Sequence, residues 1–302
     1  MLLKKGIPKH RTQLQLLHLF APRPSPPPHT PLIPGIKSQF LFFFHTKTVC
    51  LLVIKMASST ASNTPAIPHI QLLCMEKRYS LAFDAAKVKY GLPDSTRIDT
   101  HHYPLSHLPE SVKFDTVVSP ANSYGRLDGT FDDAISRAFA PTDDYFALTK
   151  AAQRLLYSRY RGFAPPGTCT LLRIPDEFHA RSRNVWDTKR VALCPTMRMP
   201  QDTRWDREVV YECIWSLLCA VGNHNRDVKE GKAAEGEEEI RDVLMTPLAT
   251  GCGVVSAERW AAQAVLAMKH YTQACEDEEF WSSLEWRSID LQALEVEQTW
   301  RL

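Results

Sequence analysis

The sequence lacks any pattern that would hold a structural metal. Its eight cysteines include no CxxC pair and no Cys/His quartet at zinc spacing. Three of them, Cys74, Cys169 and Cys194, lie inside apolar runs, as buried thiols usually do. We therefore expect a reduced, intracellular protein that binds no metal and needs no cofactor.

Acidic residues are absent from residues 1–55, which contain eight lysines and arginines. The whole chain has 36 basic and 34 acidic residues, so from Met56 onward 28 basic residues stand against 34 acidic ones and the net charge is −6. Proteins bind a nucleic-acid backbone mainly through Lys and Arg contacts. We therefore expect no nucleic-acid partner for the acidic body of the chain.

Long apolar runs are also absent, which argues against a membrane span. Lys47 separates the run at 40–44 from the run at 49–54, and neither approaches the roughly 20 residues that a spanning helix needs. Seven prolines between positions 22 and 34 exclude helix or sheet there. We predict an unstructured extension over 1–60, or an upstream start included in error before a true start at Met56.

The alternative for this basic, acid-free segment is a mitochondrial presequence, although it is poor in arginine and serine. A secretory signal would place its apolar core nearer the N-terminus. We expect a cytoplasmic protein, with a nuclear or mitochondrial location as alternatives, and a monomer.

Short apolar runs alternate with longer helical patterns from Pro65 onward. Strands are predicted at 70–75, 96–99, 115–119, 169–174, 191–194 and 243–246, and helices at 78–90, 132–139, 145–160, 207–221 and 257–274. Strands separated by helices of this length imply βαβ units with a largely parallel sheet covered on both faces. The sequence therefore predicts one α/β domain over 66–275.

Two segments stand apart from this alternation. Residues 223–239 are rich in Lys and Glu without an apolar period, so we favour a solvated charged insertion over an acidic recognition loop. Residues 276–302 contain Trp281, Trp286 and Trp300. So many tryptophans predict a helical tail that packs on the domain.

Two glycine-containing loops follow predicted strands and lead into predicted helices. The first loop, residues 120–129, follows Ser119 and precedes a helix that we expect to start at Asp132. The second loop, residues 246–256, precedes a helix capped by Ser256. Open α/β sheets bind ligands at the carboxyl ends of their strands, where helix N-termini offer free N–H groups to phosphates. Two such loops are suited to clamp the two phosphates of a diphosphate.

The motifs SPANSYGRLDG (119–129) and FDDAI (131–135) resemble the macro-domain signature, in the variant that reads NPANSFGxMDGGID. TPLATGCGVVSAERWA (246–261) is similar to that family's diphosphate-binding loop, and VALCPTMRMP (191–200) to a strand that reads roughly HAPTMRVP. The three motifs occur in the family's order within 68–275. The resemblance implies a three-layer α/β/α fold with a mixed, largely parallel central sheet.

Macro domains bind ADP-ribose and its derivatives, so the resemblance implies ADP-ribose or an ADP-ribosylated protein as the partner. Some members only read ADP-ribosylated proteins, and others hydrolyse the linkage to a side chain, deacylate O-acetyl-ADP-ribose or dephosphorylate ADP-ribose 1''-phosphate. We favour a hydrolase and keep a non-catalytic reader as the alternative.

The resemblance also implies site residues. Asn122 would bond the distal ribose, and Asp132 would be the acid beside it, ionised by the helix dipole and holding a water. The expected ligand-binding positions are Ala121, Asn122, Gly125, Gly129, Thr130, Thr250, Gly251, Cys252, Gly253 and Val254. Asp132 and Asn122 are the expected catalytic residues.

Simpler roles remain open for several of these residues. Asp132 can be a plain helix cap, and Asn122 can only stabilise its turn. Arg198 can attract a phosphate or hold backbone carbonyls beneath the loops. Thr130 stands where relatives usually have a glycine, and Ser119 replaces the first asparagine of the commoner pattern.

Overall fold

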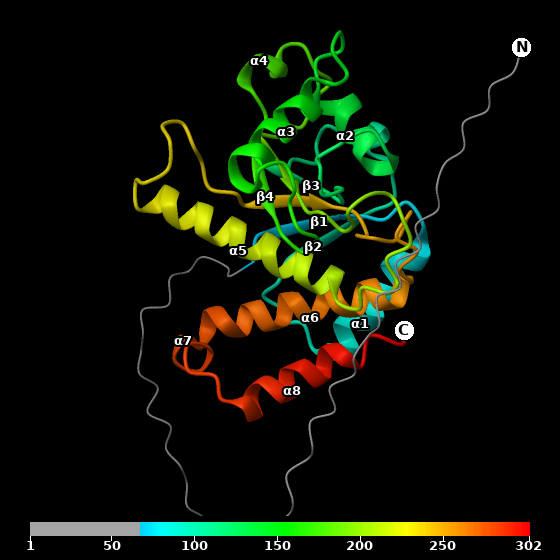
Figure 1. Ribbon diagram of the computed structural model, residues 1–302, viewed down its shortest axis with the longest axis vertical. Coiled ribbons are helices and arrows are strands. Elements are labelled where there is room, and N and C mark those ends of the chain that lie inside the picture. Colours follow the sequence, from blue (N-terminus) through cyan, green and yellow to red (C-terminus); the bar gives the residue numbers. More distant parts are fainter. Residues whose placement is uncertain (1–66) are drawn as a thin grey trace, which may run out of the picture. The chain divides into compact units, whose positions relative to one another are not determined.

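The computed structural model describes residues 67–302 (Figure 1). The extension expected at 1–60 lies outside the described residues. The strands are β1 (His69–Leu73), β2 (Ile98–His101), β3 (Thr116–Ser119), β4 (Thr170–Arg173), β5 (Arg190–Leu193) and β6 (Asp242–Met245). Every strand predicted from the alternation of apolar runs is present, within one or two residues at each end.

The larger helices are α1 (Lys77–Tyr90), α2 (Thr130–Phe139), α3 (Ala147–Tyr160), α5 (Val209–Lys229), α6 (Ala257–Glu276) and α8 (Trp286–Glu297). Three short elements complete the fold: the 3-10 helix η1 (Leu105–His107), α4 (Asp176–His179) and α7 (Glu278–Trp281). The sequence pattern did not predict η1 and α4, because a single turn carries no helical period.

The strands form one sheet in the order β2-β1-β6-β3-β5-β4. All neighbours are parallel except β4 and β5, which are antiparallel. Figure 1 shows α2, α3 and α4 on one face of the sheet and α1, α5 and α6 on the other. The predicted three-layer α/β/α fold with a mixed, largely parallel sheet is confirmed.

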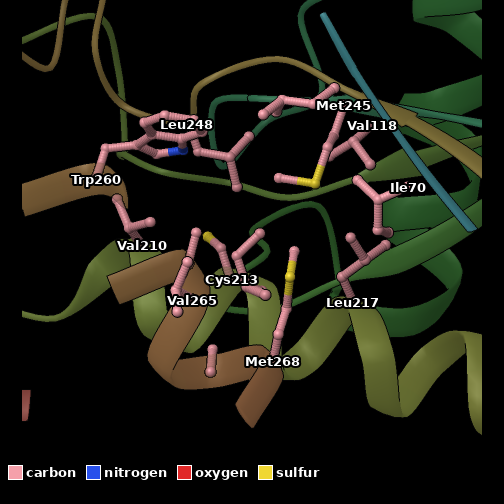
Figure 2. Close-up of a cluster of buried hydrophobic side chains, with 14 of the residues drawn as sticks. Ile70, Val118, Val210, Cys213, Leu217, Met245, Leu248, Trp260, Val265 and Met268 are labelled. Atoms are coloured by element: carbon pink, nitrogen blue, oxygen red, sulfur yellow. The ribbon is translucent and has the colours of Figure 1, made fainter. Parts of the chain in front are cut away.

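Each face of the sheet has its own apolar core, which is why the central strands are apolar at consecutive positions. Ile70, Val118 and Met245 pack against α5 and α6, where Trp260 and Met268 close the layer (Figure 2). On the same strands, Leu73, Val117 and Leu244 point to the opposite face and pack against α2 and α3. Burial on both faces makes the sheet a rigid base for the loops at its edge.

The C-terminal segment returns to the domain through α6. Thr299 is fully buried, and its Oγ1 accepts a 2.9 Å hydrogen bond from Gln263 Nε2. His270 Nε2 lies 3.0 Å from Glu295 Oε2, and the Trp300 indole donates to Glu208 Oε1 at 2.9 Å. Among residues 67–302, none of the helices combines the length and apolarity needed to cross a membrane.

The charged segment 223–239 contains exposed and half-buried residues and no fully buried one, and long-range contacts hold it to the domain. Helix α5 continues through its first half to Lys229, and Asn225 bonds both the N–H and the C=O of Ile240. In the second half, Glu237 pairs with Arg173 at 2.8 Å and with the buried Arg190. These partners lie distant in the sequence, so a local charge pattern could not indicate them.

Candidate functional site

The sheet order brings both predicted glycine loops to one place. β3 and β6 are parallel neighbours, so the first loop after β3 and the second loop after β6 leave the same edge of the sheet side by side. β5, on the other side of β3, leads into a third segment at that edge, residues 194–208, which we call the connecting loop. This carboxyl edge is where open α/β sheets bind ligands.

Asn122 organises the first loop. Its Nδ2 donates to the carbonyl of Arg126 at 2.7 Å, and its Oδ1 accepts from the N–H groups of Tyr124 at 3.1 Å and Arg126 at 3.3 Å. These bonds close a turn of the kind that Asn side chains favour. The turn-stabilising role is therefore present in the structure, and contact with a ribose stays a prediction.

The structure requires a glycine at one of the two glycine positions of the first loop and not at the other. Gly125 has φ +65°, and a Cβ there would lie 3.0 Å from Leu156 Cδ1. Gly129 has an extended backbone and open space around it, so neither packing nor conformation requires a glycine. Thr130, where a glycine is usual in the resembling family, has φ +47°, a left-handed conformation that is unfavourable for a β-branched residue.

Asp132 is buried rather than placed as a helix cap. Helix α2 starts two residues earlier than predicted, with Gly129 at the N-cap, and no side chain caps it. Asp132 Oδ1 instead accepts a 2.6 Å hydrogen bond from Oγ of the fully buried Ser119, and 6% of Asp132 is exposed.

Burial raises the pKa of Asp132 to about 7, although the Ser119 bond opposes that rise. Burial therefore opposes the expected ionisation of this carboxyl, because desolvation disfavours its charged form. A carboxyl that titrates near neutrality is suited to exchange protons.

The second loop is held by its own backbone. Val255 N–H donates to the carbonyl of Ala249 at 3.1 Å, and both Ala249 (φ +60°) and Val254 (φ +58°) are left-handed. A Cβ at Gly253 would lie 2.3 Å from the Ala249 carbonyl oxygen, so only glycine fits there. Gly251 has open space around it. As at Gly129, the protein's own packing gives no reason for that glycine.

The remaining predicted positions of the second loop divide by exposure. Thr250 Oγ1 donates to the carbonyl of Pro247 at 3.0 Å, and the Cys252 thiol and Val254 are exposed. Ser256 caps α6 by accepting from Arg259 N–H at 3.1 Å, as predicted. In the first loop, Ala121 is fully buried, and its backbone carbonyl accepts a hydrogen bond from Thr196 N–H at 3.0 Å.

The connecting loop joins the two glycine loops. Ser123 N–H donates to the carbonyl of Met197 at 3.0 Å, and Thr203 N–H donates to the carbonyl of Gly253 at 3.0 Å. Arg259, which is 4% exposed, donates to the carbonyls of Arg204 at 3.1 Å and Asp206 at 2.5 Å. The three loops are thus one hydrogen-bonded unit, which preorganises any site between them. The sequence analysis missed these contacts, which join distant residues.

Arg198 is fixed at the rim of the first loop. Its Nε donates to Tyr124 Oη at 3.2 Å, and its guanidinium lies 4.9 Å from the ring centroid of Phe163. The side chain is exposed, and neither contact involves a backbone carbonyl. The role weighed for Arg198 in holding backbone carbonyls is therefore not seen in these contacts, and its attraction of a phosphate stays a prediction.

Other features of the described residues do not define a competing site. No group of three or more His, Cys, Asp or Glu side chains within 67–302 is arranged to hold a metal. A depression of about 290 Å³ is lined by Ser136, Arg137, Tyr145 and Arg183, at the far end of α2 from the first loop. It contains no residue of the three loops.

Comparison with known proteins finds similar solved structures only. No family model matches the chain, and no curated protein matches it. Among solved structures, an Oceanobacillus iheyensis macrodomain mutant with ADPR matches at 16% identity and a TM-score of 0.38, over 53% of this chain and 72% of that one.

Two further structures of the same macrodomain match at the same TM-score. One, with ADP, is 17% identical over 53% of this chain and 70% of that one. The other, with MES bound, is 15% identical over 62% and 85%. Similarity at this level does not decide the family.

Proposed function

We propose that the carboxyl edge of the sheet binds ADP-ribose or a derivative of it. The observation that carries this proposal is the pair of open glycines, Gly129 and Gly251, on loops that follow adjacent strands. Glycine leaves backbone N–H groups open to a phosphate, and the protein's own packing needs a glycine at neither position. Two loops with this property suit the two phosphates of a diphosphate.

The resemblance of three ordered motifs to macro domains supplies the identity of that diphosphate. In this proposal the ligand contacts Ala121, Asn122, Gly125, Gly129 and Thr130 of the first loop, and residues 250–254 of the second. The side-chain amide of Asn122 is already hydrogen-bonded within the turn. In this proposal Asn122 therefore acts on the ribose mainly by fixing the loop. The free N–H groups of the loops carry the binding.

We further propose that the protein hydrolyses the bond at the distal ribose. Asp132 is the general base: with a pKa near 7 it is ionised in about half of the molecules at neutral pH. Its ionised carboxylate takes a proton from water as the water oxygen bonds to the anomeric carbon or to the acyl or phosphoryl centre of its substituent. The bond from that centre to the leaving oxygen breaks, and the leaving oxygen takes up a proton. Ser119 orients the carboxyl and stabilises its charged form. Asp132 is thus the proposed catalytic residue, and Asn122, the other residue expected to be catalytic, is proposed to position the first loop beside it.

Arg198 indicates which derivative fits. Its guanidinium is held beside the loop that contains Asn122, so it faces the region proposed for the distal ribose. A cation there favours a derivative with an anionic group on that ribose, such as ADP-ribose 1''-phosphate or an acidic ADP-ribosylated peptide. The partner is thus ADP-ribose or an ADP-ribosylated protein.

The reader function is the alternative, and one observation favours it. Asp132 is 6% exposed, so substrate reaches its carboxyl only if the first loop admits it. Calorimetry with ADP-ribose tests binding, and turnover assays on ADP-ribose 1''-phosphate and a mono-ADP-ribosylated protein test hydrolysis. Binding without turnover of either substrate would leave the reader function and refute the hydrolase.

A further inference from the structure

Cys169 and Cys194 lie opposite each other at the open end of an antiparallel strand pair. Thr170, the first residue of β4, lies opposite Leu193, the last residue of β5. The next pair in this antiparallel register, one residue before β4 and one residue after β5, is Cys169 opposite Cys194. Directly opposed residues in antiparallel strands have Cβ atoms about 4.5–5.5 Å apart. A small approach brings them within the distance of a disulfide.

The two sulfur atoms already interact. A hydrogen bond with Cys169, together with burial, raises the pKa of the Cys194 thiol. Cys194 is buried, whereas Cys169 is partly exposed. A soluble oxidant therefore reaches Cys169 first, and Cys194 is placed to react with the product.

We propose that Cys169 and Cys194 form an oxidation site, in which a peroxide converts the two thiols into a cross-strand disulfide. The Cys169 thiolate attacks one oxygen of hydrogen peroxide, giving a sulfenic acid and, after protonation, one water. The Cys194 sulfur then attacks the Cys169 sulfur and displaces the hydroxyl as a second water. Two thiols are oxidised and one peroxide is reduced, so the electrons balance.

A third thiol lies beside the pair but is directed elsewhere. Cys213 is fully buried on α5, and its Sγ donates to the carbonyl of Pro195 at 3.4 Å. Burial raises the pKa of Cys213 as it does that of Cys194, so the two thiols differ in their placement and not in their protonation. Its bond to Pro195 instead holds the start of the connecting loop. Cys213 is thus the natural competitor to test.

The disulfide would act on the candidate site through the backbone that begins at Cys194. Cys194 N–H donates to the carbonyl of Ser119 at 3.0 Å, and Ser119 Oγ holds Asp132. Thr196, two residues further, bonds Ala121 of the first loop. We expect drawing Cys194 toward β4 to move Ser119 and to weaken ADP-ribose binding several-fold. This consequence rests on the proposed function, whereas the oxidation itself does not.

The test oxidises the full chain with hydrogen peroxide, blocks the remaining thiols and maps disulfides by peptide mass spectrometry. We expect a Cys169–Cys194 cross-link that dithiothreitol reverses. In Cys194→Ser, Cys169 should accumulate as a sulfenic acid that dimedone traps, and in Cys169→Ser, Cys194 should stay reduced.

Two results would overturn the proposal: both thiols remaining alkylatable after peroxide, or a cross-link from Cys169 to Cys213. Ligand binding is measured separately on oxidised and reduced protein. A mapped Cys169–Cys194 cross-link in protein that never binds ADP-ribose supports the oxidation site and contradicts only the proposed function.

Discussion

Ser119 Oγ and Asp132 Oδ1 are 2.6 Å apart, and this bond joins the end of β3 to the first turn of α2 beneath the first loop. Both residues are buried, so the carboxyl is held in an environment that penalises its charge. The Ser119 hydroxyl opposes this penalty, because its hydrogen bond favours the charged form of the carboxyl. The protonation state of Asp132 thus links the stability of the fold to the chemistry proposed for it.

Asp132→Asn should change how stability depends on pH. The folded-state pKa is raised from 3.8 to about 7, so between these values the unfolded chain loses a proton that the folded protein keeps. The wild-type free energy of unfolding therefore falls as pH rises through this range, by up to about 4 kcal/mol, and Asp132→Asn lacks this loss.

Urea denaturation of both proteins from pH 4 to pH 8 measures the difference between their free energies of unfolding. Other titrating groups, such as His270, whose pKa burial lowers, contribute equally to both proteins and cancel in this difference. The advantage of Asp132→Asn should grow with pH and level off above about 7. A difference that is constant with pH would show that Asp132 titrates normally.

Turnover should rise with pH if Asp132 is the base. Below a pKa of about 7 the ionised fraction changes by roughly tenfold per pH unit, and kcat/KM should follow it and then level off. Ser119→Ala removes a bond to the carboxylate and should move the rise to higher pH. Ser123→Ala is the matched control, a buried serine four residues further on whose Oγ donates to the carbonyl of Met197 instead. A profile that Ser119→Ala and Ser123→Ala leave equally unshifted would contradict the role of Ser119.

Asn122→Ala should weaken both the fold and the binding of ADP-ribose. The substitution removes the side chain from three hydrogen bonds within the first loop, so we expect a loss of about 1–3 kcal/mol in the free energy of unfolding. In Asn122→Ser the hydroxyl can still accept a turn N–H, and part of the stability should return. Chemical denaturation and calorimetry on the same samples measure both. Full affinity in a folded Asn122→Ala protein would exclude a role in ligand binding.

Arg198→Ala should discriminate between ligands. Losing a hydrogen bond to a charged group costs about 1.5–3 kcal/mol, so affinity for ADP-ribose 1''-phosphate should fall roughly tenfold or more. Affinity for ADP-ribose should fall less, and Arg287→Ala on α8 should change neither. Equal losses for both ligands would mean that Arg198 does not read the distal substituent.

The sequence predicted the sheet well because each buried strand is a short apolar run between turn residues. Val117 and Val118 point to opposite cores, so burial on both faces leaves a continuous apolar signal. The start of α2 was predicted two residues late, because left-handed Thr130 is a poor helix former by residue type.

The candidate site was less accessible to sequence reasoning. The two glycine loops could be located, since each follows a strand and precedes a helix. The burial of Asp132 could not, because it depends on side chains brought together by the whole fold. The contacts Arg198 to Tyr124 and Thr203 to Gly253 join residues 74 and 50 positions apart. No local pattern indicates such pairs.

Isothermal titration of ADP-ribose into wild-type, Gly251→Glu and Gly251→Gln proteins tests the central claim most directly. Gly251 has open space around it, so both variants should fold, which thermal denaturation checks. We expect micromolar binding to the wild type, about −8 kcal/mol, no detectable binding to Gly251→Glu, and weakened binding to Gly251→Gln, which has similar bulk without the charge. Undiminished affinity in a folded Gly251→Glu protein, or no binding by the wild type, would contradict a diphosphate site between the two loops.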